Sequence, residues 1–125
     1  MINIDLHSYV YNINHKVMNK SHKFDKSLQE LAYYSKVISH PARLAILKYL
    51  AESETAISGE ISGFLPLSRT TVSQHLSELR RAGLIEYEVN GLKVVYYLNR
   101  KTIKKFNKSF KKFFSFIIKE SATGK

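Results

Sequence analysis

The strongest constraint on the fold comes from residues 67–84, LSRTTVSQHLSELRRAGL, because they divide into two unlike faces at helical spacing. Apolar residues recur on one side: Val72, Leu76 and Leu79. The other side carries short hydroxyl, amide and imidazole groups in its N-terminal half, where an ordinary surface helix would carry long charged residues. The pattern predicts a helix with one face in a core and an outer face that has a specific use.

Both ends of this predicted helix carry recognisable signals. Ser68 is a favourable N-cap, because its hydroxyl can accept a hydrogen bond from a backbone N–H of the first turn. Gly83 stands where a helix commonly ends in a left-handed residue, and Arg80 and Arg81 precede it near the negative end of the helix dipole. These signals place the helix at 68–82.

A β-hairpin is predicted directly after this helix. Residues 84–89 (LIEYEV) and 92–98 (LKVVYYL) are rich in β-branched and aromatic side chains, which favour strands. Asn90-Gly91 separates the two runs, and this dipeptide is the strongest short-range signal for a hairpin turn.

Three helices are predicted before the polar helix. The first, within residues 23–38, has one apolar or small face: Phe24, Leu28, Leu31, Ala32, Ser35 and Ile38. The second, within 39–53, begins at Pro41, which suits a first helical position, and is expected to be short and deeply buried. Its apolar residues are Leu44, Ile46, Leu47 and Leu50. The third, within 55–68, is expected to last one to two turns and to end in a turn at Pro66. Its core residues are expected to be Ile57, Ile61, Phe64 and Leu65.

The two ends of the chain differ in the strength of their patterns. Residues 1–23 are weakly amphipathic and are expected to be a helical, dimer-associated extension that forms only against a partner. Residues 100–120 predict a strongly amphipathic helix, and 121–125 are a short tail. One face of the helix is apolar: Ile103, Phe106, Phe110, Phe113, Phe114 and Ile117. The opposite face is basic: Lys101, Lys104, Lys105, Lys108, Lys111 and Lys112.

Charge and composition narrow the function before any motif is considered. The net charge is +10, of which residues 99–125 carry +8, and this indicates an anionic partner such as nucleic acid or a membrane surface. Cysteine is absent, which excludes disulfides, zinc–thiolate sites and a thiol nucleophile. No segment approaches the roughly 18 apolar residues that a membrane span needs, and the N-terminus does not resemble a secretion signal. The expected location is the cytoplasm.

The order of the predicted elements is that of a winged helix-turn-helix. Residues 24–99 would form this core, with the turn at LPL joining the short helix to the recognition helix at 68–82. The predicted fold class is mainly α (α+β), with a two-stranded β-hairpin wing and terminal dimerisation helices. The short polar groups of the recognition helix would then approach base edges and phosphates closely.

Three motifs in this order resemble the ArsR family of winged-helix bacterial repressors. They are HPARLAILKYL, LPLSRTTVSQHLSELRRAGLI and NGLKVVYYLN, and the resemblance extends over about residues 28–118. It implies a homodimer that binds an inverted-repeat operator and releases it when a metal or another signal arrives. The function expected is that of a sequence-specific regulator bound to double-stranded DNA, most simply a homodimeric repressor.

Departures from the family pattern affect the expected inducer. Metal-sensing members carry C-x-C-D-L on the short helix, and Ile57 and Gly59 match its two cysteines here. A second kind of family site uses Asp and His ligands on the last helix, but no histidine follows His75. The glycine that the family usually has in the turn before Ser68 is Pro66. These departures therefore predict no metal and no cofactor.

Candidate DNA-binding residues follow from the outer face of the recognition helix and from the wing: Ser68, Arg69, Thr70, Thr71, Ser73, Gln74, His75 and Lys93. Ser68 and Thr71 are expected to serve the cap and phosphates, and Arg69, Thr70, Ser73 and Gln74 to reach base edges. The alternative for this helix is a capped, solvated surface without a ligand. Glu86 and Glu88 weaken the case for Lys93, since they would repel DNA if they faced it. Arg43 matches a family arginine and is expected to be structural.

The candidate dimer interface gathers apolar residues of the first strong helix and the last: Leu28, Ile103, Phe106, Phe110, Phe113, Phe114 and Ile117. Burial against a second subunit is favoured. The alternative is that the basic, Phe-rich helix at 101–119 binds an anionic membrane surface or a protein partner.

Enzymatic and metal-binding functions have little support. There is no Walker loop, G-x-G-x-x-G or H-E-x-x-H, and no carboxylate pair with a nearby histidine, so no catalytic residue is expected. His7, His15 and His22 have Asp5 as the only nearby carboxylate, and they are expected to be solvated or dimer-contact residues rather than ligands.

Overall fold

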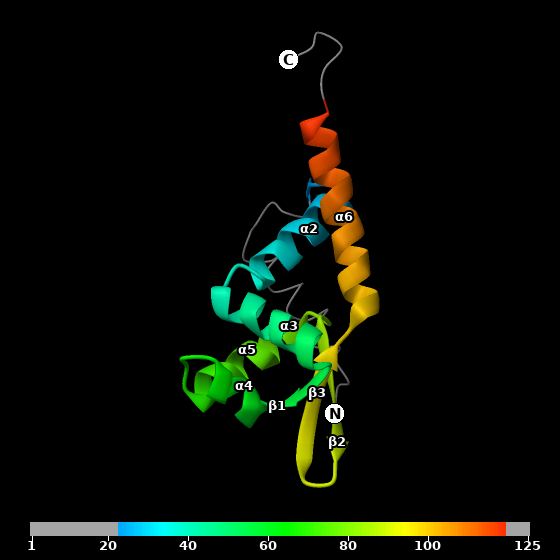
Figure 1. Ribbon diagram of the computed structural model, residues 1–125. Coiled ribbons are helices and arrows are strands. Elements are labelled where there is room, and N and C mark those ends of the chain that lie inside the picture. Colours follow the sequence, from blue (N-terminus) through cyan, green and yellow to red (C-terminus); the bar gives the residue numbers. More distant parts are fainter. Residues whose placement is uncertain (1–22, 120–125) are drawn as a thin grey trace.

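The computed structural model describes residues 23–119. In this range it contains five helices and three strands, in an order that matches the predicted winged helix-turn-helix (Figure 1). The elements are α2 (Lys26–Val37), α3 (Pro41–Ser53), β1 (Thr55–Ile57), α4 (Ser58–Phe64), α5 (Arg69–Arg81), β2 (Ile85–Asn90), β3 (Lys93–Leu98) and α6 (Arg100–Ile118). The fold is mainly helical α+β, as the sequence predicts. The extension at 1–22 and the tail at 120–125 lie outside the described residues, and so do His7, His15 and His22.

The core forms where α3, α4, α5 and the strands meet. Its most deeply buried side chains come from the three helices, from the turn after α5 and from the start of β2: Ile46, Leu50, Ile61, Val72, Leu76, Leu79, Leu84 and Ile85. The apolar side predicted for residues 67–84 is therefore buried, and its opposite side faces outward. Burial of aliphatic side chains on this scale is the main stabilising contribution in a domain of this size.

Both ends of α5 have the geometry that the sequence predicts. Ser68 Oγ accepts a hydrogen bond from Thr71 N at 3.2 Å. At the other end Leu84 N donates to Leu79 O at 3.0 Å and Gly83 N donates to Arg80 O at 2.9 Å, the pair of bonds of a Schellman motif. Gly83 has φ 76°, which a residue with a Cβ adopts only with strain.

The sheet has three strands in the order β1-β3-β2, so the predicted two-stranded wing is extended by a third strand that the sequence pattern does not predict. Thr55, Ala56 and Ile57 pair with Tyr97, Tyr96 and Val95 of β3, and the predicted short helix begins only at Ser58. Three residues are too few for an alternating pattern to appear. Their partners lie some forty positions later in the chain, so the pairing has no local signal.

The wing turn lies one residue later than predicted. Asn90 is still paired with Lys93, and the turn residues are Gly91 and Leu92. Gly91 has φ 67°, and a glycine at the first central position is typical of a type II′ hairpin turn. The Asn-Gly signal therefore identified the hairpin correctly, but Asn90 belongs to the strand.

The buried faces of α2, α3 and α4 differ from the predicted ones. In α2 the buried residues are Tyr33 and Val37, whereas Phe24 and Leu28 of the predicted face are exposed. In α3 Leu44 is exposed. At the end of α4 Phe64 is exposed as well, and its ring centroid lies 4.9 Å from that of Tyr49. These helices are short or contact the core only near one end. A prediction that buries the apolar face along the whole helix therefore names too many buried residues.

Helix α6 leaves the core and runs alongside α2, and it points away from the hairpin (Figure 1). Asn99 begins it: its Oδ1 accepts from Thr102 N at 3.2 Å, its Nδ2 donates to Glu86 Oε1 at 3.1 Å, and its backbone N donates to Leu84 O at 2.9 Å. No residue of α6 is buried within the single chain. The helix is thus fixed firmly at its start and has few contacts toward its end.

Candidate nucleic-acid interface

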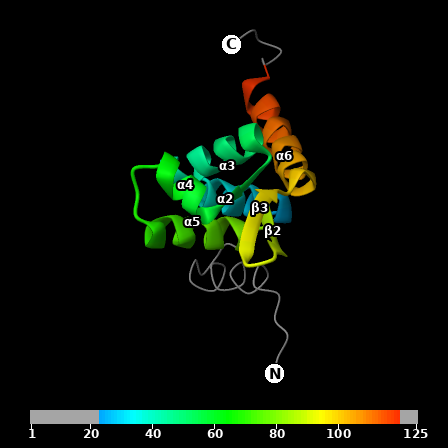
Figure 2. The same ribbon diagram turned by 60° about the horizontal axis from the view of Figure 1, so that its bottom comes forward.

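The outward side of α5 carries the residues that the sequence singles out for DNA contact. Arg69, Thr70, Ser73 and Gln74 are exposed, while Thr71 and His75 are half-buried on its flank. Figure 2 shows α5 and the hairpin next to each other on one side of the molecule. The structure therefore brings the helix residues together in one surface, with the wing beside them.

Ser68 and Thr71 are engaged with each other at the start of α5. Ser68 Oγ accepts from Thr71 N and donates to Thr71 Oγ1 at 3.0 Å. The remaining free N–H groups of the first turn point outward at the positive end of the helix dipole, where an anion is stabilised. This geometry suits the predicted roles of both residues at the cap and at a phosphate.

Arg69 lies back over α4 rather than extending freely from the helix. An added Cβ at Gly59 would come within 2.6 Å of Arg69 Nη2, so the guanidinium occupies the space that this glycine leaves. Gly59 is the position at which metal-sensing relatives of the resembled family carry a cysteine. Its lack of a side chain here gives Arg69 a resting place beside the N-terminus of α5.

His75 and Arg43 form the other flank of α5. Arg43 Nε donates to His75 Nδ1 at 3.1 Å, and Arg43 Nη1 donates to Val37 O at 2.9 Å. The arginine therefore joins α3 to α5 and to the end of α2, in agreement with the structural role expected for it. Burial, then the charge of Arg43 and then that of His40, lower the pKa of His75. The hydrogen bond that Nδ1 of His75 accepts orients the ring as part of this joint.

Two exposed residues of α5 extend the predicted surface toward the wing. Ser77 lies three and four positions after Gln74 and Ser73, on the same side of the helix. Arg80 stacks on the ring of Tyr87 in β2, with its guanidinium carbon 4.1 Å from the ring centroid. The helical spacing of three and four positions, continued beyond Gln74, places both Ser77 and Arg80 on this side of the helix from the sequence alone.

The wing has two unlike faces. Directly paired residues share a face, so Lys93, opposite Asn90, lies on the face that carries Glu86 and Glu88. Tyr87 lies on the other face, with its ring on Arg80 of α5. Tyr97 Oη and Asn99 Nδ2 both donate to Glu86 at 3.4 and 3.1 Å. Lys93 is therefore on the wing face farther from α5, and its carboxylate neighbours reduce its attraction for a phosphate.

The candidate dimer residues lie along an uncovered ladder of aromatic rings. Centroid distances are 5.4 Å between Tyr34 and Phe106, 6.0 Å between Phe106 and Phe110, and 4.5 Å between Phe110 and Phe114. The ladder starts beside the buried Tyr33 and becomes more exposed along α6. Leu28 and Ile117 are exposed at its sides.

Metal sites and membrane spans have no basis in the described part of the chain. Within residues 23–119, no group of three His, Cys, Asp or Glu side chains is placed to hold a metal ion. None of the helices in this range is both long and apolar enough to cross a membrane.

Comparison with known proteins gives the same fold and a class of function. The family model for a helix-turn-helix domain matches residues 38–88. The chain is 30% identical to the HTH-type transcriptional regulator YgaV of Escherichia coli over 69% of its own length and 87% of that protein. It is 33% identical to the transcriptional activator HlyU of Vibrio cholerae, over 66% and 75% of the two chains.

A repressor and a solved structure are also similar. The identity is 34% to the biofilm growth-associated repressor of Agrobacterium fabrum, over 59% of this chain and 62% of that protein. An ArsR-like transcriptional regulator from Rhodococcus superimposes with a TM-score of 0.64 at 23% identity, over 73% of this chain and 85% of the other. At that identity the superposition establishes the fold.

Proposed function

This chain belongs to the ArsR family of winged helix-turn-helix transcriptional regulators, and we propose that it acts as a homodimeric repressor on an inverted-repeat operator. The members of this family are not enzymes. In this proposal α5 reads the major groove of double-stranded DNA. The contacts come from Ser68, Arg69, Thr70, Thr71, Ser73 and Gln74, with Ser77 and Arg80 toward the wing. Acting on genomic DNA is consistent with a place in the cytoplasm.

The observation that carries the proposal is the division of α5. Val72, Leu76 and Leu79 are completely buried, so the orientation of the helix about its axis is fixed and its short polar side chains can only face outward. Serine and threonine at such a surface reach base edges with few rotamers to immobilise, and the glutamine amide can bond to a base edge through both its oxygen and its nitrogen. Arg69 and Arg80 flank this surface and supply charge for phosphates.

Assembly as a homodimer is supported by the uncovered aromatic ladder on α6. A monomer that exposes several phenylalanines in one row presents the kind of apolar patch that marks an interaction surface. A second copy offers the same ladder by symmetry, which is how most homodimers close. Two copies of α5 in a symmetric pair would match an inverted repeat.

Repression is proposed over activation because it needs only occupancy of the operator. The relatives include both a repressor and an activator, so the direction of regulation is this chain's own property. A reporter gene behind the operator tests it directly: expression should fall when the protein is supplied.

The test of DNA readout compares two classes of variant on operator and scrambled duplexes, after the operator has been selected from random DNA by the purified protein. Gln74→Ala should weaken operator binding by about 1–3 kcal/mol and leave scrambled DNA nearly unaffected. Lys108→Ala with Lys112→Ala should lower affinity for both duplexes modestly and reduce the salt dependence. Kd is measured by fluorescence anisotropy over a salt series. Equal losses on both duplexes for Gln74→Ala would show that a different face of α5 enters the groove.

Arg69 is a second probe of the same surface. Arg69→Ala should weaken the operator more than scrambled DNA, with some loss on both, because a guanidinium beside the first turn can also contact phosphate. Gly59→Ala is its matched control, since it displaces the resting guanidinium without removing it. If Gly59→Ala weakened operator binding as much as Arg69→Ala, the position of the guanidinium over Gly59 would matter more than its contact with DNA.

An alternative function for α6 is binding to an anionic membrane surface. The last residues of α6 favour membrane binding, since Phe116 and Ile118 are about three-quarters exposed beside lysines. The aromatic ladder argues against it, because the ladder continues into the chain's own core at Tyr34 and so belongs to the domain. Co-sedimentation with anionic liposomes that disappears in Phe116→Ser, while operator binding persists, would support the membrane function.

A further inference from the structure

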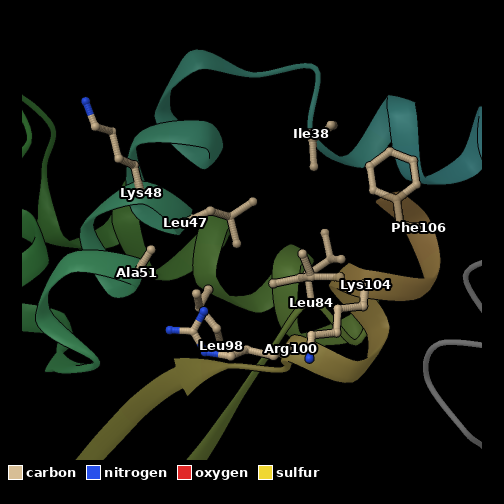
Figure 3. A pocket seen from close by; sticks show the side chains of 10 residues that line it. Ile38, Leu47, Lys48, Ala51, Leu84, Leu98, Arg100, Lys104 and Phe106 are labelled. Atoms are coloured by element: carbon tan, nitrogen blue, oxygen red, sulfur yellow. The ribbon is translucent and has the colours of Figure 1, made fainter. Parts of the chain in front are cut away.

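A cavity of about 410 Å³ lies between α3, the base of the wing and the first turns of α6 (Figure 3). None of its lining residues belongs to α5, so it is separate from the proposed DNA-reading surface. Its volume falls within the roughly 300–1,000 Å³ of typical small-molecule sites. The cavity can therefore hold a ligand without competing directly with DNA.

The walls of the cavity are almost entirely apolar. Leu47 of α3 points into the space, and Ile38 and Phe106 close the end opposite to it (Figure 3). Leu84 and Leu98, at the base of the wing, line the cavity together with Ile103 of α6. Such a lining favours a hydrocarbon or aromatic group over water.

The charged residues of the cavity are all basic. Arg100 extends past Leu98 and Lys104 lies beside Leu84, whereas Lys48 points outward on the other side (Figure 3). The lining contains no carboxylate. Among the described residues, the one ion pair joins Arg81 and Glu78, so none of these three cations has an acidic partner there. An apolar space with two unpaired cations at its mouth is complementary to a molecule with an apolar tail and an anionic head.

We propose that this cavity binds a small monocarboxylate with an apolar tail, whose carboxylate pairs with Arg100 and Lys104. The tail lies between Leu47 and Phe106. Arg100 is the better partner for the head group, because its guanidinium can donate two parallel hydrogen bonds to a carboxylate.

Binding there would affect the relation between α6 and the rest of the domain. Ile103 and Phe106 belong to the first turns of α6. The ring centroid of Phe106 lies 5.4 Å from that of Tyr34 in α2. Leu84 follows α5 after Ala82 and Gly83. A bound tail would separate or brace these elements, and operator affinity should change with it. This regulatory consequence rests on the proposed function, whereas binding of the carboxylate does not.

The experiment measures binding to the full-length protein by isothermal titration in the absence of DNA. The probes are octanoate, 1-octanol and octyltrimethylammonium, which share a tail and differ in the charge of the head. Octanoate should bind about tenfold more tightly than octanol, and the cation should be weakest. Equal affinity for all three would overturn the proposal, because it would mean a non-specific apolar surface.

Variants locate the site. Arg100→Gln with Lys104→Gln should weaken octanoate about tenfold and leave octanol unchanged. Lys101→Gln with Lys105→Gln is the matched control: it removes the same charge from the same helix at residues that do not line the cavity, and should change nothing. Ala51→Phe should fill the cavity and abolish binding of both probes, with thermal unfolding checking that the variant is folded. Equal losses in the two double variants would refute the head-group assignment.

Two further measurements separate this inference from the proposed function. Operator anisotropy with and without octanoate should show at least a threefold change in Kd, and an unchanged Kd with octanoate bound would remove the regulatory part. Light scattering should show the same oligomer in both conditions. If octanoate converted dimer to monomer along its binding curve, the cavity would be the seat of a side chain from the second copy, and the ligand proposal would be wrong.

Discussion

Helices α5 and α6 have the same kind of sequence pattern and different surroundings. Each begins at a residue whose side chain caps it, Ser68 in one and Asn99 in the other, and each has a continuous apolar face. The apolar face of α5 is no more than 1% exposed. On α6 no residue is buried, and Phe110 is 40% exposed.

The difference separates two uses of an amphipathic helix. Spacing of apolar residues shows that a face must be covered, but it does not show what covers it. The apolar face of α5 is buried by other parts of the same chain, so its apolar residues determine whether the domain folds. The single chain leaves the apolar face of α6 largely uncovered, so its apolar residues are proposed to determine assembly.

The largest effect is expected from Leu76→Ala in α5. Removing a completely buried leucine should lower the free energy of unfolding by about 2–5 kcal/mol, because it loses apolar burial and leaves a cavity. Denaturant unfolding followed by circular dichroism measures this. Ser77→Ala, next to it on the exposed side, should change stability by less than about 0.5 kcal/mol. Similar losses in the two variants would contradict the assignment of the faces.

Phe110→Asp in α6 is expected to act on assembly. Placing a carboxylate in the middle of the aromatic ladder should weaken dimerisation by about 2–4 kcal/mol, with little change in helical content. Sedimentation over a concentration series gives the dissociation constant. Asn107→Asp introduces the same charge at an exposed residue outside the predicted interface and should leave the dimer intact. A dimer unaffected by Phe110→Asp would mean that α6 does not mediate assembly.

The two caps allow a direct comparison of the helices. Ser68→Ala should cost about 1 kcal/mol of stability through the loss of one capping bond. Asn99→Ala should cost more, because the amide also donates to Glu86. Thermal unfolding ranks the variants, with Ser68→Asn as a control that retains a capping acceptor. A larger loss for Ser68→Ala would reverse the ranking and show that the start of α6 contributes little to stability.

The smallest effect concerns pH. His75 has a pKa below its usual value in the folded protein, first because of burial and then because of Arg43 and His40. The unfolded chain, with a histidine pKa of about 6.5, therefore binds more protons, so stability is greatest above about pH 6.5 and falls as the pH decreases. Unfolding free energies at about pH 7.5 and about pH 5 should differ less in His75→Gln than in the parent protein. An unchanged difference would assign the pH dependence to other groups.

The features predicted correctly from the sequence are those with a local cause. The cap at Ser68, the left-handed Gly83 and the hairpin depend on a few neighbouring residues, and all three are present. The buried face of α5 was also predicted correctly, because its pattern runs through the whole helix.

The features that were missed depend on distant parts of the chain. Strand β1 exists only because β3 lies beside it, and Arg80 reaches Tyr87 only because the wing returns to α5. The face of α2 was wrong because Tyr33 and Val37 meet the core at one end of the helix while Phe24 lies beyond it. The position of Arg69 over Gly59 depends on the packing of α4 against α5, which no spacing within one helix reveals.

Asn99 joins the part of the molecule that is proposed to read DNA to the part that is proposed to pair two copies. Its hydrogen bonds connect Leu84, just beyond the end of α5, with the first strand of the wing and the first turn of α6. In a symmetric dimer the angle held there would determine how far apart the two copies of α5 lie. Half-sites one helical turn apart are separated by about 34–36 Å, so a small change of this angle would move one reading helix out of its groove. The distance between operator half-sites that the protein accepts would then be determined at Asn99, far from any base that it reads.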